Sequence, residues 1–208
     1  MLSLLLWLLA FTTPSGSAPA YYDVAYRNEV YTAYFDSKLR EPVLVSYTLY
    51  RGGGECSRAG MSFRGDKRTA SHHDYAATGY DIGHLCNAED FAGDCAKERL
   101  TFRFYNALPQ TPNLNRGVWK VDETLVRHLS QQDSLLVLCG GIFPAPQHTI
   151  GANRVFVPTY CYKVVQSLTT HEIIFAHLYT NTDRALMSNI SLKDLEKLLG
   201  YPLPLRDK

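Results

Sequence analysis

The amino-acid sequence predicts one α+β domain, with a mixed, mainly antiparallel sheet and flanking helices. Runs rich in Val, Tyr and Thr, which are typical of strands, are grouped apart from the runs with helical spacing. A parallel sheet would need strands and helices in alternation. No low-complexity linker or internal repeat interrupts residues 21–208, so we expect a single domain with a sizeable core.

The N-terminal residues predict a secretory signal. The apolar run Leu2 to Phe11 is shorter than the roughly twenty residues that cross a bilayer, and small residues follow it up to Ala20. We therefore expect a signal peptide at residues 1–20, cleavage after Ala20, and a secreted or periplasmic mature chain that is not bound to a membrane. An N-terminal membrane anchor is the alternative, because no Lys or Arg precedes the apolar run.

Charge and cysteine content narrow the classes of function. The formal net charge of +1 excludes a globally basic nucleic-acid binder, but it is compatible with a local basic groove. The cysteines are compatible with one or two disulfides in an oxidising compartment and leave at least one free thiol. No C-x-x-C pair is present, which argues against structural zinc. Spacing leaves the pairing open among Cys56, Cys86, Cys95, Cys139 and Cys161.

The first part of the mature chain predicts a hairpin followed by a long loop. Two strand-like runs between residues 29 and 50 flank a polar turn around Asp36 to Pro42, and Gly52 to Gly54 close the hairpin. Residues Glu55 to Thr78 are polar and irregular, so we expect a loop there, either solvated or facing a substrate.

The remaining residues predict helices and three further strands. We expect a short helix at Ala96 to Asn106 and a longer one at Trp119 to Leu129, in which Trp119, Leu125 and Val126 are buried. A last helix is expected between a capping-box-like start at Ser191 and a stop at Gly200. The three strands are Ser134 to Phe143, Arg154 to Gln166 and His171 to Tyr179.

Three short boxes follow one another in the middle of the chain: DIGH at 81–84, NALPQ at 106–110 and LNRGVW at 114–119. In this order they resemble the D-R-G-H, N-x-x-P-Q and L-N-[RQ]-G-x-W boxes of the DNA/RNA non-specific endonuclease family of ββα-metal nucleases. The resemblance extends to the opening hairpin, the VPTYCYKVV strand and the LEKLLG helix. It implies an embedded ββα-metal motif and hydrolysis of DNA and RNA with little sequence specificity, dependent on Mg²⁺ or, alternatively, on Mn²⁺ or another divalent cation.

Two residues of these boxes match groups that phosphodiester hydrolysis needs. The resemblance makes His84 the general base, with its ring held by a further hydrogen bond; an unperturbed imidazole titrates at about pH 6.5 and is available as a base at physiological pH. Asn115 matches the single direct protein ligand of the cation, which suits an ion that takes oxygen ligands and keeps several waters. Considered alone, His84 is an ordinary residue at a strand end and Asn115 a helix cap.

Glu123, Arg127 and Asn106 complete the set of implied site residues. Glu123 matches a carboxylate that holds metal-bound waters, and Arg127 matches an arginine near the scissile phosphate. Asn106 matches an asparagine that supports the base or the surroundings of the metal. The alternatives are an i,i+4 ion pair between Glu123 and Arg127 and a turn role for Asn106.

Helix geometry adds one constraint to this site. Eight residues along a continuous α-helix rise about 12 Å, which is too far for Asn115 and Glu123 to reach one ion comfortably. We therefore expect Arg116 and Gly117 to lie in a turn, with the helix proper starting near Trp119. Glycine fits such a break because it is unfavourable inside a helix.

The first box departs from the family pattern, because Ile82 stands where the family has arginine. Another cation, from Arg58, Arg64 or Arg68 in the irregular loop, can fill this gap as a substrate-binding residue; otherwise the enzyme is slower, or the protein binds nucleic acid without cutting it. We favour an active nuclease, because the base and the metal ligand are both present. The alternative is a catalytically weakened or inactive nucleic-acid-binding relative.

The resemblance implies DNA and RNA as substrates and a homodimer as one expected assembly, because parts of the family dimerise. An alternative interpretation as a secreted toxin would add an inhibitor protein as a partner. Asn189 begins a glycosylation sequon, which has meaning only in a eukaryotic secretory pathway.

Overall fold

The computed structural model describes residues 22–207, so the expected signal peptide at residues 1–20 lies outside the described residues. The strands are β1 (Val24–Arg27), β2 (Tyr31–Asp36), β3 (Glu41–Leu49), β4 (Asp81–His84), β5 (Ala107–Gln110), β6 (Leu135–Ile142), β7 (His148–Ile150), β8 (Val155–Val157), β9 (Tyr160–Ser167), β10 (Ile173–Thr180) and β11 (Met187–Asn189). The α-helices are α1 (His72–Tyr75), α2 (Cys95–Thr101), α3 (Trp119–Leu129) and α4 (Leu192–Leu199). Short helical turns are η1 (Ala88–Phe91), η2 (Phe104–Asn106) and η3 (Leu114–Val118).

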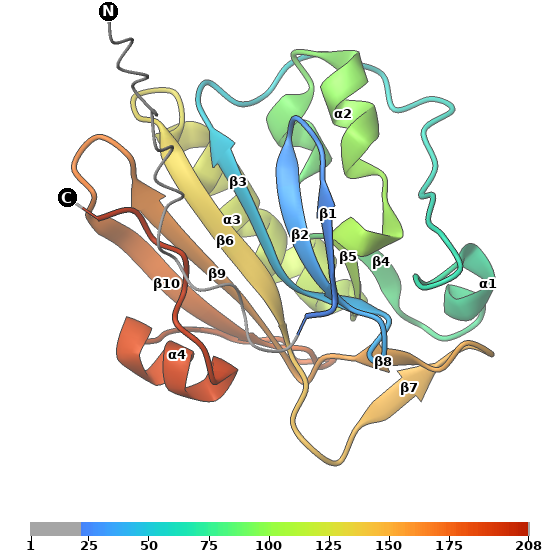
Figure 1. Cartoon of the computed structure of the whole chain (residues 1–208). Coiled ribbons are helices and arrows are strands. Elements are labelled where there is room, and N and C mark those ends of the chain that lie inside the picture. The colour runs from blue at the N-terminus through green and yellow to red at the C-terminus, as the bar shows by residue number, and fades with distance from the viewer. Residues whose placement is uncertain (1–21, 208) are drawn as a thin grey trace, which may run out of the picture.

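A seven-stranded sheet in the order β1-β2-β3-β6-β9-β10-β11 forms the centre of the molecule (Figure 1). Every neighbouring pair in it is antiparallel. Strands β4 and β5 form a separate antiparallel pair, as do β7 and β8. The predicted α+β class with a mainly antiparallel sheet is confirmed.

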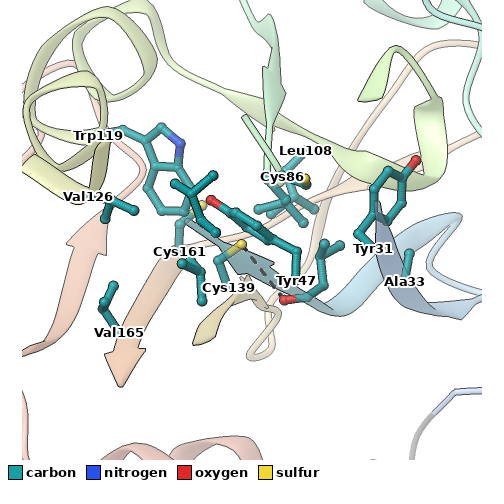
Figure 2. Packing of buried hydrophobic residues seen from close by; sticks show 14 of the residues in the cluster. Tyr31, Ala33, Tyr47, Cys86, Leu108, Trp119, Val126, Cys139, Cys161 and Val165 are labelled. Carbon is teal, nitrogen blue, oxygen red and sulfur yellow. Dashed lines mark hydrogen bonds between the residues drawn. The ribbon is translucent and has the colours of Figure 1, made fainter. Parts of the chain in front are cut away.

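The central strand β6 is buried on both faces of the sheet. Successive side chains of a strand point to opposite faces, and here Val137 and Cys139 join one apolar cluster while Leu136 and Leu138 join the other. The first cluster lies between the sheet and α3, where Trp119 packs among the buried side chains (Figure 2). Helix α4 covers the second cluster on the opposite face. The β4–β5 pair therefore shares the sheet face covered by α3, because its neighbouring apolar residues belong to the first cluster.

Strands β4 and β5 and helix α3 form a compact ββα unit. Gly83 allows the close approach within this pair, since a Cβ atom there would lie 2.1 Å from Oε1 of Gln110. The indole Nε1 of Trp119 donates to the backbone oxygen of His84 at 3.2 Å and so ties the start of α3 to the end of β4. The first and third sequence boxes are thus joined directly.

Most predicted elements are confirmed, and the differences have local causes. The expected helix at 96–106 ends at Thr101, because the chain turns into η2 before β5. The expected strand at 154–166 divides into β8 and β9 at Pro158, which has no N–H to donate to a ladder. The irregular segment at 55–78 contains the short helix α1, and β1 precedes the predicted hairpin. Leu125 was expected to be buried but is 39% exposed, because it lies on the outer face of α3.

Both ends of the last helix are as predicted. The Ser191 side chain accepts from the backbone N–H of Asp194, and Gly200 ends α4 with φ of 76°, a left-handed conformation that suits glycine. Within residues 22–207, no helix is both long and apolar enough to cross a membrane.

The described residues contain one disulfide, between Cys56 and Cys95, with the two Cα atoms 5.4 Å apart. It joins the irregular loop to the first residue of α2. The other cysteines are buried thiols, which agrees with the expectation that at least one thiol is left over. These thiols are Cys86, Cys139 and Cys161.

Candidate active site

One pocket of about 600 Å³ gathers side chains from β4, η1, η3, α3 and the irregular loop. Four of its lining residues are basic and two are acidic, so a basic site exists on a chain whose formal net charge is only +1. It brings together His84 and Asn115, which lie far apart in the sequence. The lining residues are Arg58, Ile82, His84, Asn87, Ala88, Glu89, Asn115, Arg116, Lys120, Glu123 and Arg127.

His84 ends β4, as predicted, and its imidazole lies between two aromatic rings. The ring centroids are 4.5 Å from Phe63 and 4.8 Å from Phe102. Its Nε2 atom is buried and has no hydrogen-bond partner among the described residues. The described residues form no hydrogen bond with the His84 side chain, so the expected bond that holds the ring is absent, and aromatic packing holds the ring instead.

The surroundings of His84 keep its imidazole neutral. Burial, and to a smaller extent the Arg58 guanidinium, lower the pKa of His84 from 6.5 to about 3. A neutral imidazole has one nitrogen free to accept a proton. A bound phosphate would bring negative charge close to the ring and raise this pKa, which makes the imidazole a stronger base.

Asn115 lies in η3, where a carboxylate fixes the orientation of its amide. Its Nδ2 donates to Oδ2 of Asp81 at 3.0 Å, so its oxygen is the group left over for another partner. Asp81 also accepts two hydrogen bonds from Arg116, at 2.8 and 2.6 Å. Burial raises the pKa of Asp81, but the bonds from Arg116 and Asn115 outweigh it and leave the pKa below its ordinary value. The side chain of Asn115 therefore hydrogen-bonds to a residue of β4 and does not cap a helix.

The predicted break in the helix lies at Gly117. Its φ of −105° and ψ of −113° are not helical, and η3 gives way to α3 at Trp119. The kink lets Asn115 and Glu123, on either side of it, line the same pocket. Burial raises the pKa of Glu123 above its ordinary value, although Lys163 and Asn87 act in the opposite direction.

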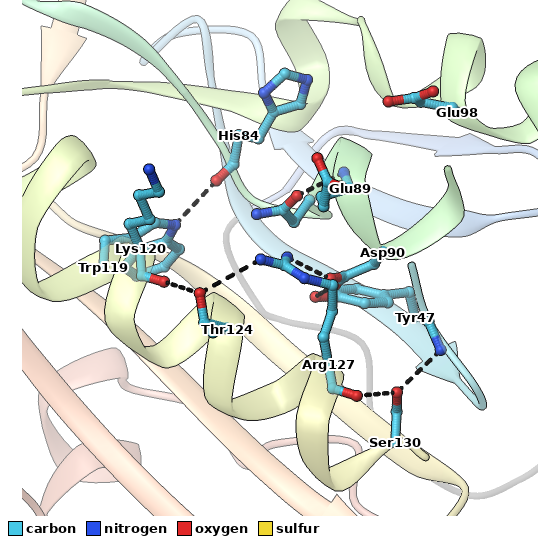
Figure 3. Close-up of polar contacts among 12 residues, drawn as sticks. Tyr47, His84, Glu89, Asp90, Glu98, Trp119, Lys120, Thr124, Arg127 and Ser130 are labelled. Atoms are coloured by element: carbon cyan, nitrogen blue, oxygen red, sulfur yellow. Dashed lines mark hydrogen bonds and ion pairs between the residues drawn. The ribbon is translucent and has the colours of Figure 1, made fainter. Parts of the chain in front are cut away.

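Arg127 reaches from α3 to a carboxylate in η1 and not to Glu123. Its Nη1 donates to Oδ1 of Asp90 at 3.0 Å, and the Tyr47 hydroxyl donates to the other oxygen of Asp90 at 3.0 Å (Figure 3). The salt bridges of the described residues include no Glu123–Arg127 pair, so that alternative is wrong. Burial raises the pKa of Asp90 to about 6, against the effect of Arg127.

Asn106 does not line the pocket and is fully buried. Its Oδ1 accepts from the backbone N–H of Cys86 at 2.8 Å, and its Nδ2 donates to the backbone oxygens of Cys86 and Thr101 at 2.9 and 2.8 Å. Both amide hydrogens are used. The side chain can therefore position the segment that follows His84, but it is not free to contact a substrate.

Among the three candidate arginines of the irregular loop, only Arg58 lines the pocket. Two carboxylates hold its guanidinium, Glu89 at 2.5 Å and the buried Glu98 at 3.0 Å. Arg68 pairs with Asp66 outside the pocket. The backbone of Arg64 bonds to that of Phe102 and Phe104, and the residue lies outside the lining. The expectation that Arg64 and Arg68 face the site is not supported by their positions.

Sequence reasoning missed two basic residues of the pocket, Arg116 and Lys120. Their spacing of four, which places side chains on one face of a helix, was an available signal. It was weak, because η3 and α3 are interrupted at Gly117.

The donor set can be tested for its fit to a hard divalent cation. No group of three or more His, Cys, Asp or Glu side chains in residues 22–207 could hold a metal ion. The pocket instead offers the amide oxygen of Asn115, oriented by Asp81, and the carboxylate of Glu123. Oxygen donors in small number fit an ion such as Mg²⁺, which keeps several of its own waters.

Comparison with known proteins gives a family and a set of relatives. The sequence model of the family described as DNA/RNA non-specific endonuclease matches residues 15–207. Human mitochondrial endonuclease G is 29% identical over 157 residues, covering 66% of this chain and 52% of that protein. The mitochondrial nuclease EXOG of Danio rerio is 31% identical over 128 residues, covering 54% and 37%. A nuclease of Nostoc is 29% identical over 145 residues, covering 61% and 51%. The chain spans about half the length of the curated relatives it matches.

A solved structure has the same fold. The crystal structure of the EndoG/EndoGI complex, which concerns the mechanism of EndoG inhibition, superposes with a TM-score of 0.76 at 22% identity and covers 90% of this chain and 87% of that one.

The animal relatives also correct one expectation. They are mitochondrial proteins, which contradicts the predicted secreted or periplasmic location. The N-terminal apolar run indeed lacks the positively charged segment that begins a secretory signal.

Proposed function

The chain belongs to the DNA/RNA non-specific endonuclease family, and from this premise we propose that it is a metal-dependent nuclease that hydrolyses phosphodiester bonds of DNA and RNA. One observation carries the proposal: the imidazole of His84 and the oriented amide of Asn115 line one basic pocket. A nucleic acid brings phosphates, which a pocket of this charge attracts.

His84 is the general base in this proposal. Its neutral imidazole takes a proton from a water molecule while the water oxygen attacks the phosphorus atom. The bond from phosphorus to the 3′ oxygen breaks, and a solvent water molecule gives that oxygen a proton, while the His84 imidazolium later releases its proton to solvent. The products are 5′-phosphate and 3′-hydroxyl ends. Asn106 acts through position, because it fixes the backbone next to the base.

Arg127 neutralises charge on the phosphate, and a divalent cation would do so when bound. Arg127 keeps N–H groups free beyond those bonded to Asp90 and Thr124 and can direct them at phosphate oxygens. Asn115 would hold the cation through its oxygen, and Glu123 would hold it through water. When bound, the ion supplies Lewis-acid stabilisation of the developing negative charge.

Cleavage of a supercoiled plasmid and of a long RNA tests the proposal. We expect both to be cut with Mg²⁺ and left intact with EDTA. Asn115→Ala should lower the rate by roughly a thousandfold, because the charge stabilisation lost is worth several kcal/mol. Asn189→Ala is the matched control, since Asn189 is exposed on β11 outside the pocket. Binding of the plasmid without cutting would identify the inactive nucleic-acid-binding relative instead. Full activity of Asn115→Ala would contradict the single-ligand site.

Two further proposals concern partners. A protein inhibitor would have to cover the basic pocket, and an acidic surface would complement its charge. A homodimer remains a prediction, to be measured by the mass of the protein in solution.

A further inference from the structure

The wall of the pocket formed by β4 has no positive charge of its own, because Ile82 lines it. The four cations around the pocket differ in how much of their hydrogen-bonding capacity is already used. Arg58 is held by two carboxylates and Arg127 by one. Neighbouring acids therefore offset part of the charge of these two arginines, as Asp81 does for Arg116.

Arg116 differs from them in exposure and in orientation. Its side chain is 71% exposed, yet its guanidinium is fixed by two hydrogen bonds to Asp81, from Nε at 2.8 Å and from Nη2 at 2.6 Å. These bonds use two of the five N–H groups of arginine and leave the others for a further acceptor. The same carboxylate holds the amide of Asn115, the neighbouring residue. Asp81 thus orients both the guanidinium of Arg116 and the side-chain amide of its neighbour Asn115.

Arg116 is placed where it can supply the positive charge that Ile82 does not provide. Arg116 lines the same pocket as Ile82, and its ion pair with Asp81 ties its guanidinium to the same strand, β4. A guanidinium with free parallel N–H groups binds phosphate oxygens well. A long side chain that is already oriented also loses less rotamer entropy when a phosphate binds.

We propose that Arg116, oriented by Asp81, is the residue that binds a substrate phosphate at the β4 wall, in place of an arginine at position 82. The inference rests on the proposed nuclease function and adds to it a substrate-binding residue. Arg116 contacts a phosphate of DNA or RNA and does not read the bases. Its contribution therefore depends on salt concentration and not on sequence.

The experiment measures binding of a duplex DNA oligonucleotide to protein carrying His84→Ala, so that the DNA is not cut. In this background, Arg116→Gln should weaken binding roughly tenfold at 0.1 M salt and lower the slope of log affinity against log salt by about one, the amount expected for one lost phosphate contact. Arg27→Gln is the matched control, because Arg27 is an exposed arginine of β1 outside the pocket. It should change neither quantity.

An arginine exchange between the two positions sharpens the test. Ile82→Arg combined with Arg116→Gln should recover most of the affinity and the salt slope that Arg116→Gln alone loses. Unchanged affinity and slope in Arg116→Gln would overturn the inference, as would a double variant no better than Arg116→Gln. Plasmid cleavage by the unmodified protein is read separately. If that cleavage fails while Arg116→Gln still weakens DNA binding, the proposed catalytic function is wrong and the phosphate contact stands.

Discussion

Asp122 and Glu123 are neighbours on α3, yet the tertiary structure gives them opposite surroundings. Asp122 faces the sheet, where its Oδ2 accepts from Nδ1 of His177 at 2.5 Å and from the hydroxyl of Tyr179. Glu123 faces the basic pocket, where the described residues give its carboxylate no salt bridge. Helix α3 therefore separates two polar networks: one in the core, whose carboxylate is paired with buried donors, and one at the pocket, whose carboxylate has no salt bridge among the described residues.

His177 and His84 differ in the same way: one has a buried partner and the other has none among the described residues. His177 has a buried carboxylate as partner and stacks on Phe175 with the ring centroids 4.3 Å apart. The buried Nε2 of His84 has no partner among the described residues. Buried polar atoms without partners are rare in native proteins, because leaving them unpaired costs about 1 to 3 kcal/mol. An unpaired buried atom in a residue that lines a pocket, as in His84, therefore indicates a role beyond packing, whereas a fully paired one indicates a structural role.

Removing each histidine gives the largest expected difference between the two networks. His84→Ala should lower kcat/KM by about a hundredfold to ten-thousandfold, the range for loss of a general base. His177→Ala should leave kcat/KM within a few fold but lower the free energy of unfolding by about 1 to 3 kcal/mol, because Asp122 loses a buried partner. Plasmid cleavage and urea unfolding of both variants measure the two quantities. A rate loss in His177→Ala equal to that of His84→Ala would break the comparison.

The two adjacent carboxylates give the next effect. Glu123→Gln should lower the rate about tenfold to a hundredfold and weaken the dependence on Mg²⁺, with little loss of stability. Asp122→Asn should do the reverse, because an amide cannot accept both buried donors as a carboxylate does. The readouts are a Mg²⁺ titration of the cleavage rate and the melting temperature. If both variants change the same quantity, α3 does not separate two networks.

The pH dependence of stability tests the surroundings of His84. Its pKa of about 3 in the folded protein lies below the unfolded value of about 6.5, so the unfolded state binds the proton first. Stability should therefore fall as pH falls below about 6.5, by about 2 kcal/mol between pH 7 and pH 5 from this residue alone. His84→Ala should remove that part of the fall, as measured by urea unfolding at both pH values. An equal fall in the variant would show that the folded protein protonates His84 readily.

Glu41 tests whether an unpaired buried group always indicates function. It is fully buried on β3, neither carboxylate oxygen has a partner among the described residues, and it does not line the pocket. Burial raises its pKa well above the ordinary value, so the folded state keeps a proton that the unfolded state releases above about pH 4.3. Stability from this group is present at low pH and is lost as pH rises.

Glu41→Gln should remove that loss. Between pH 5 and pH 8, the unmodified protein should lose more stability than the variant, because only the unmodified protein must release this proton on unfolding. Urea unfolding at both pH values measures this, and plasmid cleavage should stay within twofold. A large loss of cleavage would connect Glu41 to the active site and weaken the distinction between the pocket and the core.

The site could be predicted from the sequence only as far as residue types and spacing reach. Arg116 and Gly117 were placed in a turn before α3 because a straight helix would separate Asn115 from Glu123, and Gly117 is indeed non-helical. The partner of Arg127 was not predictable, because Asp90 lies on a different element, 37 residues earlier in the chain.

The sequence by itself determined the elements whose signals are local: the opening hairpin, the period of α3, the caps of α4 and the three boxes. Only the tertiary structure decided which cations face the pocket, which way adjacent residues of α3 point, and that Cys56 pairs with Cys95. The physical reason is distance along the chain. Hydrogen-bonding capacity, turn conformation and hydrophobic period belong to a few consecutive residues, whereas burial and ion pairing depend on elements that meet only when the sheet and its helices pack together.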